Sequence, residues 1–294
     1  MEVIDKLNSL DLEKAQLLEI TKLVDLLKPL RLLGLEVPKG HSIYRARPTE
    51  AEAFSTSSEL SYNPNPKSFG RCHYPGQSIF YGSIASETIN YPIITNLAET
   101  SLIFRNKLPD VGKFQMTVGK WIVEKPFQVA AIVSDSVFAG KNQSLLNLSN
   151  SYNDFIESSP EYQETKFIAE YLAEQFSKGD IKNDFEYKLT AAICNKIYSN
   201  KINGILYPSV RTQGDGFNIA IAPQIVDSSL KLFGVGVHTI YHKDRKLVVD
   251  NNKFAYADEF GNYNLQPMTE DFIGEKIALK ILNGELAYKP GKFM

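Results

Sequence analysis

Two helical patterns in the middle of the chain, with strand-like runs on either side, constrain the fold more than any other feature. Ile168, Leu172 and Phe176 follow one another at intervals of four residues, and residues 185–197 repeat this spacing. Each segment therefore predicts an amphipathic helix. Apolar and polar residues alternate over 114–118 and 217–221, as in β-strands. Because helices and strands do not alternate one for one, the order predicts an α+β fold with mixed or antiparallel sheets and flanking helices.

Both ends of the chain add further elements. Residues 11–28 have apolar residues at helical spacing, with Asp11 as the expected N-cap. Residues 231–263 predict β-hairpins, and residues 270–286 predict a closing helix. We expect three parts: an N-terminal helical extension over 1–40, a central domain over 41–230, and a C-terminal extension of hairpins and a helix over 231–294 that packs on the same domain.

Composition excludes several classes of protein. The net charge is −2 and the basic residues are scattered, whereas proteins that bind nucleic acid usually carry a basic stripe. The chain has 2 cysteines far apart in sequence, which argues against a disulfide scaffold and against a zinc site. No run approaches the ~20 apolar residues of a membrane span, and the first residues lack signal-peptide features. We expect a cytoplasmic protein that binds neither nucleic acid nor membranes.

Several common catalytic motifs are missing. The sequence has no phosphate-binding P-loop, and Gly234-Val235-Gly236 lies in a strand-like run that opens no helix. His238 and His242 are four residues apart in an extended segment, hence about 13 Å from each other and too far apart to share a metal ion. Ser209 does not lie in a Gly-x-Ser-x-Gly elbow. We therefore expect neither a metal site nor a hydrolase triad.

Three segments carry the functional signal. They are Ile43 to Arg47; Gly70-Arg71 through Pro75-Gly76 to Tyr81; and Gly204 to Arg211 with Gly216-Phe217-Asn218 after it. Each segment alone has an ordinary structural explanation: a surface arginine, a loop that begins with Gly-Arg, or a strand that ends at Pro-Ser. Their occurrence together, in this order, is more specific.

In these segments the chain resembles the RES domain family, named for an Arg, a Glu and a Ser. The resemblance covers roughly residues 41–225 through short motifs. It implies a fold related to the diphtheria-toxin-like ADP-ribosyltransferases and a site that binds NAD as its substrate. It also implies a bacterial toxin-like role, with a separate antitoxin protein as partner.

The residue types suit NAD chemistry. Arg45 and Arg71 offer permanently charged, bidentate forks to a pyrophosphate. Tyr81 could stack on the nicotinamide ring, and Ser209 could hydrogen-bond the adjoining ribose. The resemblance adds Asn218 to the NAD-binding residues. The predicted catalytic set is Arg71, Tyr81, Glu99 and Ser209.

The carboxylate is where the chain departs from the family pattern. The family's Glu lies about three helical turns after the tyrosine, and Pro92 occupies that register here. Glu99 is the preferred substitute, displaced by an insertion around Tyr91 to Ile93. Glu87 is the first alternative, although it matches a structural Glu early in the family's helix. A site without a catalytic Glu is the second.

The sequence thus predicts an NAD-degrading enzyme that cleaves the nicotinamide–ribose bond by phosphorolysis or hydrolysis. A catalytically silent NAD-binding or interaction module on the same fold is the alternative from another class. A protein ADP-ribosyltransferase is a third possibility, with a side chain as acceptor.

Overall fold

The computed structural model describes residues 2–49, 54–85, 92–100, 111–134, 137–138, 142–199, 202–243, 246–268 and 274–285. The chain forms two compact units, each assembled from separate stretches of sequence. The first unit comprises Met1–Ile43, Tyr62–Thr95 and Ile122–Lys231, and the second comprises Tyr44–Ser61, Asn96–Trp121 and Leu232–Met294. The expected N-terminal extension over 1–40 therefore lies in the same unit as much of the expected central domain.

The sheet of the first unit is mixed. Its strands, in spatial order, are β1 (Leu33–Val37), β5 (Phe127–Ala131), β6 (Gly204–Pro208), β7 (Phe217–Ile221) and β3 (Phe80–Ile84). The pair β5–β6 is parallel, and the β1–β5, β6–β7 and β7–β3 pairs are antiparallel. Together with the helices around it, this sheet confirms the predicted α+β class.

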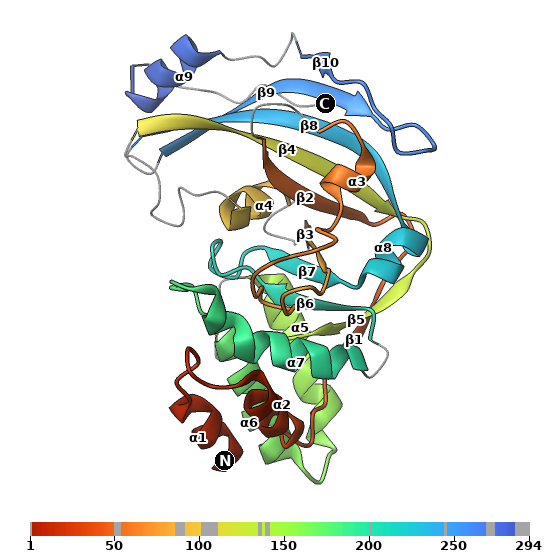
Figure 1. Ribbon diagram of the computed structural model, residues 1–294, viewed down its shortest axis with the longest axis vertical. Helices are drawn as coiled ribbons and strands as arrows, with labels where there is room; N and C mark the ends of the chain where they lie inside the picture. The colour runs from red at the N-terminus through yellow and green to blue at the C-terminus, as the bar shows by residue number, and fades with distance from the viewer. Residues whose placement is uncertain are drawn as a thin grey trace. The chain divides into compact units, whose positions relative to one another are not determined.

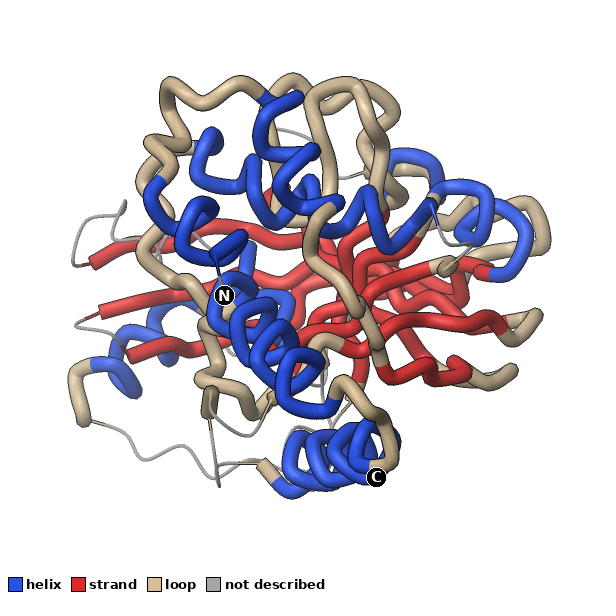
Figure 2. The backbone as a smooth tube through the Cα atoms, turned by 90° about the horizontal axis from the view of Figure 1, so that it is seen from below, coloured by secondary structure: helices blue, strands red, loops and turns tan. Residues whose placement is uncertain are grey.

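Helices cover this sheet, and buried side chains of the helices and strands together form the core of the unit. They are α1 (Glu2–Ser9), α2 (Leu17–Asp25), α5 (Gln143–Glu157), α6 (Tyr162–Phe176), the 3₁₀ helix η2 (Asp184–Tyr187), α7 (Lys188–Ser199) and α8 (Pro223–Ser229). In Figure 1, α1, α2, α6 and α7 lie together below the strands, and Figure 2 shows the helices from below. Buried Ile20 of α2, Phe176 of α6 and Ile193 of α7 belong to one apolar cluster with Ile205 of β6. Burial of such side chains is the main stabilising term of the unit.

Two lysines of α7 donate hydrogen bonds to backbone carbonyls of the N-terminal segment. The ammonium of Lys196 donates to the carbonyls of Val24, Asp25 and Leu27 at 2.8, 3.1 and 3.0 Å, where α2 ends. The ammonium of Lys188 donates to three further carbonyls between residues 12 and 15. Burial lowers the pKa of Lys196 from its ordinary value, but the three carbonyls compensate for lost hydration.

The second unit is built on long strands. Its strands, in spatial order, are β2 (Ser42–Thr49), β4 (Val111–Val123), β8 (Leu230–Lys243), β9 (Lys246–Tyr256) and β10 (Gln266–Pro267), and its helices are α3 (Ser57–Leu60), α4 (Ile93–Thr100) and α9 (Glu275–Leu282). Some elements cross a boundary between units by a few residues. Strands β8 and β9 form an antiparallel hairpin with a bulge between Val237 and His238.

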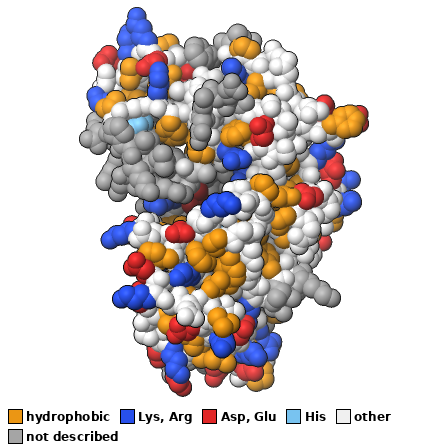
Figure 3. Space-filling model, in the orientation of Figure 1, with side chains coloured by type: hydrophobic (Ala, Val, Ile, Leu, Met, Phe, Trp, Pro, Cys, Tyr) orange, Lys and Arg blue, Asp and Glu red, His pale blue; other side chains and the backbone are white. Residues whose placement is uncertain are grey.

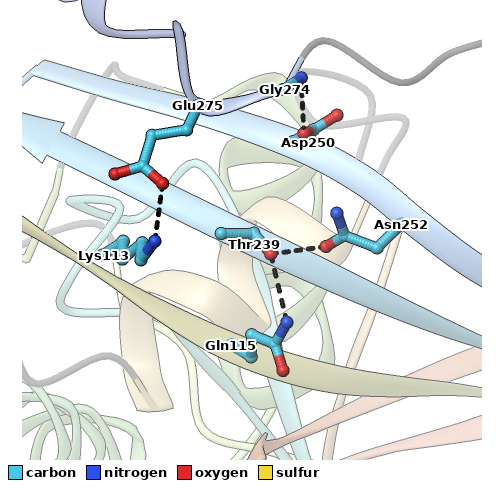
Figure 4. A network of polar contacts seen from close by, with 7 residues as sticks. All are labelled: Lys113, Gln115, Thr239, Asp250, Asn252, Gly274 and Glu275. Atoms are coloured by element: carbon cyan, nitrogen blue, oxygen red, sulfur yellow. Dashed lines mark hydrogen bonds and ion pairs between the residues drawn. The ribbon is translucent and has the colours of Figure 1, made fainter.

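Polar side chains link these strands to α9 (Figure 4). The Thr239 hydroxyl donates to Asn252 Oδ1 at 2.5 Å and accepts from Gln115 Nε2 at 3.4 Å. Buried Asp250 accepts a hydrogen bond at 2.9 Å from the N–H of Gly274, the N-cap of α9. A carboxylate at this end suits the helix dipole. The contacts join β4, β8, β9 and α9 into one body.

Most of the predicted helices and strands are confirmed, but the N-terminal helix begins later than predicted. The strands near 114–118 and 217–221, the two central helices and the C-terminal hairpin are all present. The helix predicted from residue 11 instead begins at Leu17, so the prediction of Asp11 as N-cap was wrong. The Asp11 carboxylate accepts from the N–H of Glu13, and the Ala15 N–H donates to the Asp11 carbonyl. These bonds close a separate turn before the helix.

Two surface properties bear on the composition argument. Among the described residues, no helix is both long and apolar enough to cross a bilayer. On the face drawn in Figure 3, Lys and Arg side chains are interspersed with Asp and Glu side chains. The described part of that face therefore has no large patch of one sign.

The N-terminal helices provide a test of the first unit's core. Ile20 is fully buried, whereas Leu18 on the same helix is 63% exposed. We predict that Ile20→Ala lowers the free energy of unfolding by about 2–5 kcal/mol and that Leu18→Ala changes it by less than about 0.5 kcal/mol. Chemical denaturation of both variants measures the difference. Equal effects would show that α2 does not belong to the core.

Candidate functional site

Arg71 is held at the end of α6. Its Nη1 donates to the carbonyl of Phe176 at 2.7 Å, and its Nη2 donates to the carbonyl of Lys178 at 3.1 Å. The guanidinium carbon lies 5.3 Å from the ring centroid of Tyr187 and 5.9 Å from that of Tyr207. A cation at the carbonyl end of a helix is favourable. These contacts give Arg71 a structural role, and its predicted role on a pyrophosphate stays a prediction.

The Gly-Arg motif opens a tight turn. Backbone hydrogen bonds join Gly70 and His73 in both directions. A Cβ on Gly70 would lie 2.1 Å from the imidazole of His73, so a larger residue would displace this ring from its position beside the Tyr81 hydroxyl. The hydroxyl of Tyr81 accepts from the N–H of Cys72 at 2.8 Å and lies 2.8 Å from His73 Nδ1. The turn thus fixes the orientation of Tyr81.

Protonation in this turn follows from burial. Burial, and secondly the neighbouring Cys72, raises the pKa of Tyr81 well above its ordinary value. Burial lowers the pKa of His73. At neutral pH the imidazole is therefore uncharged, and the arrangement that satisfies both groups has the Tyr81 hydroxyl donating to Nδ1. Tyr81 acts here as a neutral phenol.

The strand register places Asn218 on the same face as Tyr81. Asn218 of β7 pairs with Ser83 of β3 and with Tyr207 of β6. Paired residues point to the same face, and so do residues two apart on one strand. Asn218, Ser83, Tyr81 and Tyr207 therefore share the face that packs under α6 and α7. Since Arg71 lies over the ring of Tyr207, the structure places Arg71, Tyr81 and Asn218 on the same face of this sheet.

Ser209 begins the turn that joins β6 to β7. Its N–H donates to the carbonyl of Gly216 at 2.7 Å, and its hydroxyl accepts from the N–H of Thr212 at 3.3 Å. The residue is fully buried, so these bonds make it a turn-forming serine. Its predicted contact with a ribose stays a prediction. A Cβ on Gly216 would lie 2.1 Å from the hydroxyl of Thr95, which explains the glycine two residues before Asn218.

Asn142 holds this turn from the neighbouring helix. Its Nδ2 donates to the carbonyls of Gly214 and Asp215 at 2.9 and 2.7 Å. Its Oδ1 accepts from the N–H groups of Ser144 and Leu145 and caps α5. The sequence reading missed this residue. An asparagine before Leu145, Tyr152 and Ile156 at helical spacing is the signal that predicts it.

A small pocket lies beyond the ends of the parallel strands β5 and β6. Its free volume is about 10 Å³, room for about one water molecule and far below the ~300–1,000 Å³ typical of drug-sized ligands. As it stands, the pocket is too small for any ring of a dinucleotide. The lining residues are Ser134, Val137, Phe138, Ala173, Phe176, Ser177 and Pro208.

Arg45 and Glu99 belong to the second unit. Arg45 lies on β2, and Glu99 lies in the last turn of α4. The side-chain amide of Asn96 joins these two elements, because Nδ2 donates to the carbonyl of Tyr44 at 2.7 Å and Oδ1 accepts from the N–H of Ala46 at 3.3 Å. Asn96 therefore binds the backbone on both sides of Arg45. Glu99 follows Asn96 by three residues, hence on the same side of the helix.

Glu87, the alternative catalytic carboxylate, lies outside the described residues.

Asn96, like Asn142, was not predicted from the sequence as a residue of the site. Its partners lie about fifty positions away in the chain, and no local sequence pattern predicts such a long-range contact.

The two histidines that were predicted to lie in an extended segment are both in strand β8. His238 and His242 both lie within the strand, and His238 Nδ1 is 2.8 Å from Asn251 Oδ1. In the described part of the chain, no group of three or more His, Cys, Asp or Glu side chains is arranged to bind a metal ion.

Comparison with known proteins adds no family assignment: no protein-family model matches the chain, and no curated protein matches it significantly.

The Asn142 contacts generate a stability prediction. Asn142→Ala removes the helix cap and the donor to a buried carbonyl, that of Gly214, and to a half-buried one, that of Asp215, so we expect the free energy of unfolding to fall by about 2–4 kcal/mol. Asn142→Ser restores the cap alone and should recover about half of the loss. Exposed Asn147→Ala on the same helix is the control. Chemical denaturation measures all three, and a loss no larger than that of the control would contradict this role.

Proposed function

We propose that the protein degrades NAD by cleaving the bond between nicotinamide and ribose, on a fold related to the diphtheria-toxin-like ADP-ribosyltransferases. The observation that carries the proposal is the Asn96 clamp, which holds the helix of Glu99 on the strand of Arg45. NAD cleavage requires a cation for the pyrophosphate and a carboxylate for the ribose. The two hydrogen bonds of Asn96 support the proposal because they join the strand of Arg45, the cation, to the helix of Glu99, the carboxylate, within the second unit.

In the proposed reaction Arg45 binds pyrophosphate oxygens through its fork of N–H donors. As the C1′–N bond breaks, its electron pair leaves with nicotinamide and positive charge develops on the ribose. The Glu99 carboxylate stabilises that oxocarbenium character. Water or phosphate then forms the new bond at C1′, and the products are nicotinamide with ADP-ribose or its 1-phosphate. Attack by water also releases one proton.

Residues of the first unit support the alternative of a catalytically silent module. Arg71 donates to the carbonyls of Phe176 and Lys178, and Ser209 accepts from Thr212 within its own turn. Both residues that resemble the family's site thus stabilise the fold directly. A protein that had lost catalysis would keep them for this reason alone.

Nicotinamide release separates the two functions. We predict release from NAD by the purified protein, with phosphate dependence if the acceptor is phosphate. Glu99→Gln should lower kcat by about 100- to 1,000-fold, since it removes the charge that stabilises the transition state. Arg45→Lys keeps the charge but loses the bidentate fork, so KM for NAD should rise by about tenfold or more.

Exposed Glu157→Gln is the control and should leave kcat unchanged. No release with or without phosphate would refute the enzyme and favour the silent module. Labelled ADP-ribose on a protein band would instead indicate a protein ADP-ribosyltransferase.

The clamp itself predicts a positioning effect. Asn96→Asp keeps an acceptor for the N–H of Ala46 but loses the donor to the carbonyl of Tyr44. We expect kcat to fall by about tenfold while KM for NAD changes little, because the helix of Glu99 moves and the pyrophosphate contact remains. Steady-state kinetics with NAD measures the split. An unchanged kcat would show that the clamp does not position the carboxylate.

A further inference from the structure

A strip of side chains with aromatic rings at its centre crosses β4, β8 and β9 of the second unit, where the β8–β9 hairpin is open. Its members are Lys120 of β4, Phe233 of β8, and Phe254 and Tyr256 of β9. The rings of Phe233 and Tyr256 meet edge to face with centroids 5.4 Å apart, and those of Tyr256 and Phe254 are 4.8 Å apart. The Lys120 ammonium lies 5.1 Å from the ring centroid of Phe233. We call this continuous row the aromatic strip.

Two rings of the aromatic strip are open to solvent. Phe233 is 46% exposed and Tyr256 is 67% exposed. The third ring, that of Phe254, has a role within the chain, since it covers Gly234, where a Cβ would lie 3.3 Å from the ring. Phenylalanine and tyrosine are enriched at protein–protein interfaces, and tyrosine often contributes much of the binding energy there. The exposed area of these two rings therefore indicates a docking surface.

A positive charge marks one end of the strip. The Lys120 ammonium lies 5.1 Å from the ring centroid of Phe233 and 6.0 Å from that of Tyr44 on β2. Attraction between a cation and the faces of aromatic rings favours this position. In the part of the chain that the structure describes, Lys120 takes part in no ion pair. The ammonium is therefore held beside the exposed rings and can still pair with a carboxylate.

An acidic turn marks the other end. Exposed Glu259 follows Tyr256 by three residues, in the segment that leads to β10, on the side of β9 away from β8 and β4. The Asp258 carboxylate accepts from the N–H groups of Phe260 and Asn262 at 2.9 and 2.8 Å and so fixes the turn. Glu259 itself takes part in no ion pair within the described ranges. The turn thus presents a negative charge beyond the rings.

We propose that the aromatic strip binds a second copy of this chain in a two-fold symmetric dimer. In such an interface the same surface meets itself after a rotation of 180°. A cation at one end, rings in the middle and a carboxylate at the other end are self-complementary in this arrangement. Lys120 of each copy pairs with Glu259 of the other, and Tyr256 packs near the two-fold axis. A surface of one charge would repel its own copy, whereas this order of charges attracts it.

The proposed interface is independent of the proposed NAD cleavage. Tyr44 belongs to the side of β2 that faces Lys120, and the next residue, Arg45, points to the opposite face of the strand. Dimerisation therefore leaves Arg45 uncovered. The few side chains of the strip cover less than the ~800 Å² per partner of a standard stable interface. We accordingly expect a weak dimer, with a Kd of about 10–100 µM.

Sedimentation equilibrium over about 1–500 µM protein tests the dimer. We expect monomer at the lowest concentrations and dimer at the highest. Tyr256→Ser should weaken the dimer by about tenfold or more. Leu18→Ser changes a side chain of similar exposure, 63%, on α2 of the first unit; it is the matched control and should leave Kd unchanged. Monomer at every concentration, or an unchanged dimer in Tyr256→Ser, would overturn the proposal.

Charge reversal tests the two-fold pairing. Lys120→Glu alone and Glu259→Lys alone each bring like charges together at both ends of the interface, so each variant should remain monomeric. An equal mixture of the two variants places opposite charges together again and should dimerise with a Kd close to that of the unaltered protein. Unfolded chains could not give this recovery. No dimer in the mixture would overturn the charge pairing, and assemblies larger than a dimer would overturn the two-fold arrangement.

Discussion

The first unit depends on cationic side chains that supply donors to carbonyl groups left free where helices and turns end. Each α-helix ends with carbonyls that have no partner inside the helix. Lys196 satisfies those of α2, Lys188 those of the turn before it, and Arg71 those that follow α6. Arg211 adds a similar bond to the carbonyl of Gly179. Without these donors, three connections in the unit, those before and after α2 and the one after α6, would bury polar groups at a cost.

The need to satisfy these carbonyl groups gives the motifs that resemble the RES domain family a structural role. A side chain at position 70 would displace the imidazole of His73, and one at position 216 would displace the side chain of Thr95. Arg71 is required by the carbonyls at the end of α6. A pattern of glycines, arginine and serine that resembles a binding site is thus also the pattern that this scaffold needs. The proposed chemistry consequently depends more on Arg45 and Glu99 of the second unit.

Periodic elements could be predicted from sequence, and long-range polar contacts could not. The helices around Ile168 and Ile193 and the hairpin of β8 and β9 follow from spacing alone. The start of α2 could not, because its N-cap is Gln16, which carries no capping hydrogen bond. Asn96 and Asn142 were missed for different reasons. Asn142 has a local capping signal, whereas the partners of Asn96 are set only by the tertiary fold.

The way in which Asn96 recognises β2 has an evolutionary consequence. Its amide contacts the carbonyl of Tyr44 and the N–H of Ala46, which every non-proline residue type would present equally well. Neither bond involves the side chain between them. The side chain at position 45 can therefore vary while helix and strand stay joined. Under the proposed function, in which Arg45 binds the pyrophosphate, a single substitution at that position would alter ligand preference in one step while the two bonds of Asn96 stay in place.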